Sequence, residues 1–164
     1  MGMKKFKISW IKNKAIGMRL EKFVTNILQQ KTEDIVAILL FGSLARKTAI
    51  FTKDYQSDID FLIISHNLPK DILSRRFYSA DLSKTLGLGI DQLWFPPEEI
   101  IALVESHRVF FMEIIKYGKI LFEKDEFFTK LQKTINKTLK EKGIRESKNV
   151  WLWPQSNPGC EIKW

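Results

Sequence analysis

The chain has 164 residues, of which 45% are hydrophobic and 28% charged, a composition typical of a globular domain with a core of its own. Its longest uninterrupted apolar run, residues 35–41, is too short to cross a bilayer, and its single cysteine, Cys160, excludes an internal disulfide. No apolar signal core follows the basic N-terminus, so we expect a cytoplasmic protein without a membrane span.

The net charge of +8 lies at the two ends of the chain. Residues 1–22 carry a net +6 and residues 124–164 a net +4, whereas the body between them carries a net −2. Basic ends attract RNA or another polyanion, but they also serve simply to keep a protein soluble. The sequence leaves both interpretations open.

The first half of the chain predicts two buried strands among helices. Apolar residues at helical spacing indicate an amphipathic helix over 17–30, and the short β-branched run at 34–42 indicates a buried strand. We expect a short helix over 43–51 with Ser43 as its N-cap. The polar stretch 53–57 is typical of a loop, and 58–65 has the pattern of a second buried strand.

The second half adds two strands and four helices. A helix opened by Pro69 and closed by Gly87 is expected over 68–87, followed by a strand over 89–95. The remaining expected elements are helices over 97–106, 108–118 and 127–143, a short strand over 119–123, and an aperiodic tail over 151–164. This order predicts an α/β (α+β) domain with a small mixed sheet flanked by helices.

Two aspartates open the second strand, although the strand is otherwise apolar. Side chains alternate along a strand, so Asp58 and Asp60 share one face. Carboxylates placed side by side repel each other and require a compensating cation. Hard oxygen ligands suit Mg²⁺ or Mn²⁺, and Asp91, at the start of the next strand, is the candidate third ligand.

A glycine and a serine follow the first strand. Gly42 allows the backbone to approach a ligand closely, and the following helix start offers N–H groups to a phosphate. The Ser43 hydroxyl, and Arg46 or Lys47 one turn later, would reach the same anion. Phosphates held here beside metals on the aspartates form the arrangement that two-metal phosphoryl or nucleotidyl transfer requires.

The order of these motifs resembles the DNA polymerase beta-like nucleotidyltransferase superfamily. "LFGSLARK" stands where its minimal nucleotidyltransferases (MNT type) show Gly-Ser-Arg-Ala-Arg-Gly, and "SDIDFLII" is similar to their Ser-Asp-Ile-Asp strand. The resemblance implies a nucleotidyltransferase domain at 17–124. It leaves a basic extension at 1–16 and a C-terminal helix with a Trp-rich tail at 125–164.

The resemblance also implies a reaction. An enzyme of this kind moves a nucleoside monophosphate, here AMP, from an NTP to a hydroxyl, with Mg²⁺ or Mn²⁺ bound by Asp58, Asp60 and Asp91. Gly42, Ser43, Arg46 and Lys47 are the implied nucleotide-binding residues. Minimal members commonly pair with a HEPN-domain protein as a toxin–antitoxin couple, so a tyrosine of such a partner is the implied acceptor.

The sequence departs from the family pattern in three places. Leu44 replaces the first arginine, Lys47 replaces the closing glycine, and the loop before Asp58 is longer than in the minimal members. Two alternatives therefore stay open: an antitoxin-like binding module with weak or no catalysis, and an RNA-directed nucleotidyltransferase. The tail tryptophans Trp151, Trp153 and Trp164 favour packing, against the body or between copies in a homo-oligomer, over base stacking.

Overall fold

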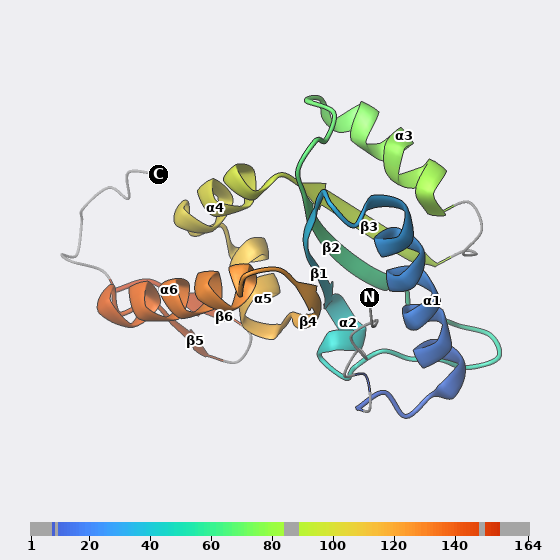
Figure 1. Ribbon diagram of the computed structural model, residues 1–164. Coiled ribbons are helices and arrows are strands. Elements are labelled where there is room, and N and C mark those ends of the chain that lie inside the picture. The colour runs from blue at the N-terminus through green and yellow to red at the C-terminus, as the bar shows by residue number, and fades with distance from the viewer. Residues whose placement is uncertain (1–7, 9, 84–88, 148–149, 155–164) are drawn as a thin grey trace.

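The computed structural model describes residues 8, 10–83, 89–147 and 150–154, and a four-stranded sheet lies at its centre (Figure 1). Its strands are β1 (Ile35–Phe41), β2 (Ile59–Ser65), β3 (Ile90–Phe95) and β4 (Lys119–Glu123), in the order β3-β2-β1-β4. The strand β1 runs antiparallel to β2 and β4, whereas β2 and β3 are parallel. The predicted mixed sheet is confirmed.

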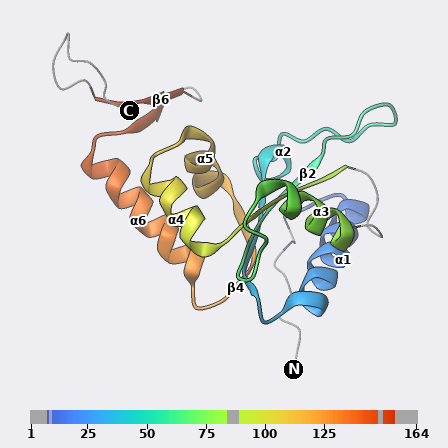
Figure 2. The ribbon, with the colours of Figure 1, turned by 90° about the horizontal axis from the view of Figure 1, so that it is seen from above.

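Helices cover both faces of this sheet. One layer holds α1 (Lys14–Lys31) and α3 (Ile72–Ser83), and the other holds α4 (Pro97–Glu105), α5 (Val109–Tyr117) and α6 (Phe127–Glu141) (Figure 2). A four-residue helix, α2 (Gly42–Ala45), follows β1 directly. A small hairpin of β5 (Arg145–Ser147) and β6 (Val150–Leu152) follows α6. We call residues 145–152 the C-terminal hairpin.

Alternation along β2 divides the core into two layers. Ile59, Phe61 and Ile63 pack toward α1, where the rings of Phe61 and Phe23 stack with centroids 4.1 Å apart. Leu62 and Ile64 pack toward α4, α5 and α6 on the other face. Because Asp60 is two residues from Leu62 along β2, its side chain lies on the same face of the sheet, the one that these three helices cover.

The helix expected over 43–51 is wrong beyond its first turn. Lys47 adopts a left-handed backbone conformation, with φ 63°, immediately after α2. The Thr48 N–H donates to the Ser43 carbonyl over 2.9 Å and the Lys47 N–H to the Leu44 carbonyl over 3.1 Å. These are the two hydrogen bonds of a Schellman motif, which ends a helix.

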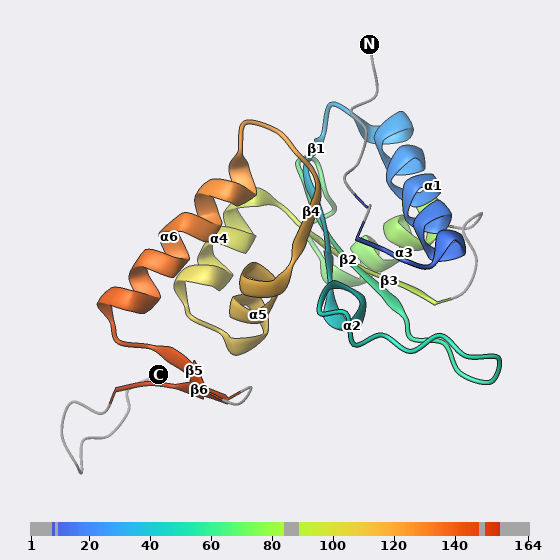
Figure 3. The ribbon, with the colours of Figure 1, turned by 90° about the horizontal axis from the view of Figure 1, so that it is seen from below.

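The chain then forms an arm, which includes the loop expected over 53–57. Residues 50–57 fold back on themselves, with the Ser57 N–H donating to the Ile50 carbonyl over 2.9 Å and a bridge between Phe51 and Gln56. The arm extends away from the sheet (Figure 3). It contains the additional residues that the sequence showed before Asp58.

Other boundaries differ more modestly. The helix expected from residue 68 begins at Ile72, where the Asp71 carboxylate accepts from the Ser74 N–H over 2.8 Å, and its expected end at Gly87 lies outside the described residues. The C-terminal hairpin was not predicted, because 151–164 was interpreted as an aperiodic tail; Cys160 and Trp164 lie outside the described residues. Among the helices that the structure describes, none is long and apolar enough to span a membrane.

Candidate active site

Asp60 and Asp91 lie side by side at one end of the sheet. They are direct partners in the parallel register of β2 and β3, so both carboxylates leave the same face of the sheet. They line a cleft of about 610 Å³. The cleft is completed by residues of β1, β3, α3 and α5: Phe41, Ile90, Gln92, Leu93, Arg76, Ser79, Ala80 and Phe110.

Gly42 packs directly against Asp60. Its φ of +67° lies in the left-handed region, and a Cβ at this position would be 2.0 Å from Oδ2 of Asp60. Any larger residue would displace the carboxylate as well as strain the backbone. The glycine that the sequence singled out for close approach to a ligand is therefore also required for its approach to Asp60.

Asp58 lies just before β2, near the start of β3. A Cβ at Gly89 would be 3.5 Å from Oδ1 of Asp58, and the Ile59 N–H donates to the Gly89 carbonyl over 2.9 Å. Asp58 and Asp91 are exposed, whereas Asp60 is partly buried. The three aspartates predicted from the sequence therefore gather at one end of β2 and β3.

The electrostatics of this group are unfavourable without a ligand. Burial raises the pKa of Asp60, and the nearby carboxylates of Asp91 and then Asp58 raise it further. None of the three forms an ion pair with another described residue. Within the described ranges, no three acidic, His or Cys side chains are arranged as a ready metal-binding group.

The donor set nevertheless suits Mg²⁺. This ion keeps several waters and is bound by one or two carboxylates together with substrate phosphates, and not by a closed protein cage. Asp60, flanked by Asp91 and Asp58 in an open cleft, offers oxygen ligands of that kind and negative charge that a cation would neutralise. The metal assignment itself stays a prediction.

Ser43 and Lys47 lie on either end of α2, but Ser43 is not its N-cap. Phe41 holds that position, and Ser43 lies within the helix, where its carbonyl accepts from Thr48 and Ala49. Lys47 is exposed at the C-terminal end. Both nucleotide-binding assignments stay predictions; the start of α2 beside Asp60 is consistent with them.

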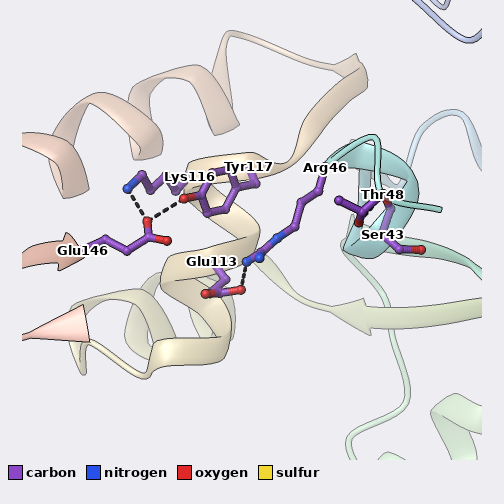
Figure 4. A network of polar contacts seen from close by, with 7 residues as sticks. All are labelled: Ser43, Arg46, Thr48, Glu113, Lys116, Tyr117 and Glu146. Carbon is purple, nitrogen blue, oxygen red and sulfur yellow. Dashed lines mark hydrogen bonds and ion pairs between the residues drawn. The ribbon is translucent and has the colours of Figure 1, made fainter. Parts of the chain in front are cut away.

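Arg46 has partners within the protein. Its guanidinium forms an ion pair with Glu113 of α5 and lies 4.5 Å from the centroid of the Tyr117 ring (Figure 4). The side chains of Arg46 and Glu113 are each only 28% exposed. The structure thus places the guanidinium toward α5, on the side of α2 that faces the C-terminal hairpin.

Sequence reasoning missed the residues that α3 and α5 bring to the cleft. Arg76 and Ser79 of α3 and Phe110 of α5 line it together with Asp60 and Asp91. Phe110 is exposed, and its ring meets that of Phe41 edge-on, with centroids 5.9 Å apart. An arginine or a serine on a helix carries no motif, so only the packing of α3 beside β3 reveals them.

This geometry agrees with the family comparison. A family model described as "Polymerase beta, Nucleotidyltransferase" matches residues 22–127, which is more than half of the chain. The chain therefore belongs to this nucleotidyltransferase family. The match includes every predicted site residue, from Gly42 to Asp91, and ends before the C-terminal hairpin.

Individual relatives are more distant. A Methanocaldococcus jannaschii protein named "Putative protein adenylyltransferase MJ1305" is 28% identical over 131 residues, which are 77% of this chain and 85% of that protein.

Among solved structures, a toxin–antitoxin crystal structure with AMP-PNP matches with a TM-score of 0.48 and 19% identity, over 75% of this chain and 92% of that one. A nucleotidyltransferase from Sulfolobus solfataricus matches with a TM-score of 0.44 and 18% identity, over 76% and 96%.

Proposed function

We propose that the protein transfers a nucleoside monophosphate from an NTP, with Mg²⁺ or Mn²⁺, to a hydroxyl group of a protein. One observation carries this proposal: Asp60 and Asp91 lie side by side in an open cleft, beside the Gly42 turn, and neither forms an ion pair with another described residue. Such an unfavourable arrangement is expected where a cationic ligand binds.

The residues take distinct roles in this scheme. Asp58 and Asp60 would hold both metal ions and Asp91 one of them, and the metals would polarise the phosphate and neutralise the charge that develops on it. Gly42, the Ser43 hydroxyl and the α2 amides would hold the β- and γ-phosphates, with Lys47 close by. Asp91 would accept the proton of the attacking hydroxyl while the α-phosphorus bond to pyrophosphate breaks.

The donor and the acceptor have separate support. The name of the Methanocaldococcus jannaschii relative supports adenylyl transfer to a protein, and hence ATP as the donor. The sequence resemblance favours a tyrosine of a HEPN-type partner as the acceptor. The basic ends of the chain, with a net +6 over residues 1–22, support RNA as the alternative, which salt-dependent retention on RNA would reveal.

Labelled ATP tests the reaction. With Mg²⁺ and candidate acceptors, label on the α-phosphate should be transferred and label on the γ-phosphate should not. Asp60→Asn should lower transfer by at least about 10²-fold, because it removes a charged ligand from the site of developing charge. Asp54→Asn, an equal change on the exposed arm, is the control. Transfer of γ-label, or full activity in Asp60→Asn, would overturn the mechanism.

Calorimetry tests the metal separately. Because Mg²⁺ relies on substrate phosphates, it should bind weakly to the free protein and tightly once ATP is present. Asp58→Asn combined with Asp60→Asn should remove this coupling. Tight Mg²⁺ binding without nucleotide would point to a different and preformed site.

A binding module is the second candidate. The observation in its favour is that Arg46, a residue of the Gly-Ser motif, is occupied by Glu113 and Tyr117 and so is turned away from a nucleotide. A partner that is inhibited without ever being labelled would support this alternative.

A further inference from the structure

We propose that the C-terminal hairpin positions the nucleotide site. Glu146 of the hairpin holds Tyr117, Tyr117 holds Arg46, and Arg46 keeps α2 in place. The three are positioning residues and touch no substrate. The inference rests on the proposed function only in naming NTP as the ligand whose affinity the hairpin sets. It assigns a role to a segment that lies beyond the residues matched by the family model.

The first step is the docking of the hairpin on α5. Glu146 lies in β5, yet its side chain is only 7% exposed. Its Oε2 accepts from the Tyr117 hydroxyl over 2.5 Å and forms an ion pair with Lys116. Trp151, the partner of Glu146 across the hairpin, is buried, and its ring lies 5.2 Å from Nζ of Lys116.

The polarity of these contacts fixes the orientation of Tyr117. Lys116 and the Tyr117 hydroxyl both lower the pKa of Glu146, so the carboxylate stays charged and remains an acceptor for the phenol. A tyrosine held at its hydroxyl end presents a fixed ring face. Tyr117 therefore connects the hairpin to the residue that packs on its ring face.

Arg46 is the residue that packs on the face of the Tyr117 ring. Its guanidinium carbon is 4.5 Å from the centroid of the Tyr117 ring, and Glu113, one turn before Tyr117, holds the same guanidinium by an ion pair. Figure 4 shows the series from Glu146 to α2. A planar guanidinium between a ring face and a carboxylate has little freedom to move.

The last step links Arg46 to the site. Arg46 is the C-cap of α2, and its N–H donates to the Gly42 carbonyl over 3.2 Å. Gly42, at the other end of the same turn, packs against Asp60. Since α2 has only four residues, an anchor on Arg46 restrains the whole turn, including the amides proposed to bind phosphate.

Amide hydrogen exchange over residues 43–48 in the free protein tests this link without any chemistry. Tyr117→Phe removes only the hydroxyl that Glu146 accepts from, Tyr117→Leu also removes the ring face, and Glu146→Gln removes the charge. We expect exchange to quicken in all three, most in Tyr117→Leu. Arg145→Gln, an exposed neighbour of Glu146 in β5, should leave exchange unchanged.

Nucleotide binding and kinetics give a second readout. The Kd for ATP with Mg²⁺, and the KM, should rise about threefold to tenfold in Tyr117→Leu, as expected for a lost cation–π contact, while kcat changes little. Tyr117→Phe and Glu146→Gln, which break the contact between the hairpin and the ring but keep the ring face, should raise both the Kd and the KM by a smaller factor. A purely structural role would instead lower the melting temperature without separating KM from kcat.

The outcomes separate this inference from the proposed function. Unchanged exchange over 43–48 in Tyr117→Leu and Glu146→Gln, both still folded by circular dichroism, would overturn the inference whatever the activity. Faster exchange in a protein that never transfers α-label would support the inference and count against the proposed reaction. Faster exchange with unaltered ATP affinity would overturn the claim that the hairpin sets nucleotide binding.

Discussion

Two groups of charged residues flank α2, and they are organised in opposite ways. On the cleft side, Asp60 has its pKa raised by burial and by the carboxylates of Asp91 and Asp58. On the α5 side, Glu146 has its pKa lowered by Lys116 and Tyr117. Charges that serve the fold are paired within it, whereas unpaired charges that destabilise it indicate a place kept for a ligand.

The comparison extends to α3, which carries one arginine that is paired within the fold and one that lines the cleft. Arg75 is turned inward and binds both carboxylate oxygens of Glu99 over 2.7 Å, whereas its neighbour Arg76 is exposed and lines the cleft. Adjacent residues of one type are thus divided between structure and site. The predictions below use this division, from the largest expected change in stability to the smallest.

Replacing Arg75 should cost the most stability. Its side chain is 7% exposed and also donates to the Pro69 carbonyl over 2.6 Å, so Arg75→Met removes a buried guanidinium together with its hydrogen bonds to Glu99, Pro69 and Lys70. We expect the free energy of unfolding to fall by about 3 kcal/mol in urea titrations, because several hydrogen bonds of one charged group are lost together. Arg76→Met is the matched control and should change it by less than about 0.5 kcal/mol. Equal losses in the two variants would contradict the division.

Gly42→Ala tests the contact between the turn and the carboxylate. The new Cβ would lie 2.0 Å from Oδ2 of Asp60 on a backbone with φ +67°, so both the aspartate and α2 must move. We expect a loss of about 2 kcal/mol in unfolding free energy, with weaker ATP binding. Gly17→Ala, where the new Cβ would be 3.7 Å from Cδ1 of Ile8, is the control. It should be neutral or stabilising, since Gly17 lies within α1.

Much of the fold and of the acidic group could be predicted from the sequence. Short β-branched runs defined the strands, and the spacing of Asp58 and Asp60 placed them together at the mouth of β2, as the structure shows. These features are local, and the strand period alone determines them.

The rest depends on contacts between distant segments. Nothing near Arg46 indicates that Glu113, 67 residues later, will hold its guanidinium. The C-terminal hairpin was missed because its strands have three residues each, too few to show an alternating pattern. The helix expected over 43–51 ends early because the Schellman turn at Lys47 carries no glycine to mark it in the sequence.

The cleft carboxylates should make stability depend on pH in a defined direction. A folded-state pKa raised above the ordinary value of 3.8 means that the folded protein releases the Asp60 proton less readily than the unfolded chain. Stability therefore falls as pH rises from about 3.8 through the raised pKa of Asp60. Asp60→Asn should remove this fall, so that the variant is more stable than the wild type at pH 7.

The measurement is chemical denaturation between pH 3 and 8 in EDTA. The gain in Asp60→Asn should be smaller than the loss in Gly42→Ala and should vanish at the acid end of the range. Asp54→Asn, on the exposed arm, should show no such trend. A variant less stable than the wild type at neutral pH would show that Asp60 is compensated after all, and the contrast between the two sides of α2 would be lost.

The smallest expected effect lies at Lys47, an exposed residue just after α2. Its φ of 63° is one that glycine adopts without strain, so Lys47→Gly relieves the strained backbone. Glycine also adds entropy to the unfolded chain, which offsets part of this gain, and we expect the unfolding free energy to rise by about 0.5–1 kcal/mol. Lys53→Gly, on the arm, should give no gain. Lys47→Met keeps the strained backbone and removes only the charge.

The pair of Lys47 variants decides why a lysine stands there. If its ammonium binds nucleotide phosphate, both variants should weaken ATP binding in the presence of Mg²⁺, although only Lys47→Gly gains stability. The lysine would then be a further residue that lowers stability for the sake of a ligand, like Asp60. If both variants bind ATP as the wild type does, Lys47 only ends α2, and the unpaired charges that serve the ligand are confined to the cleft side of the turn.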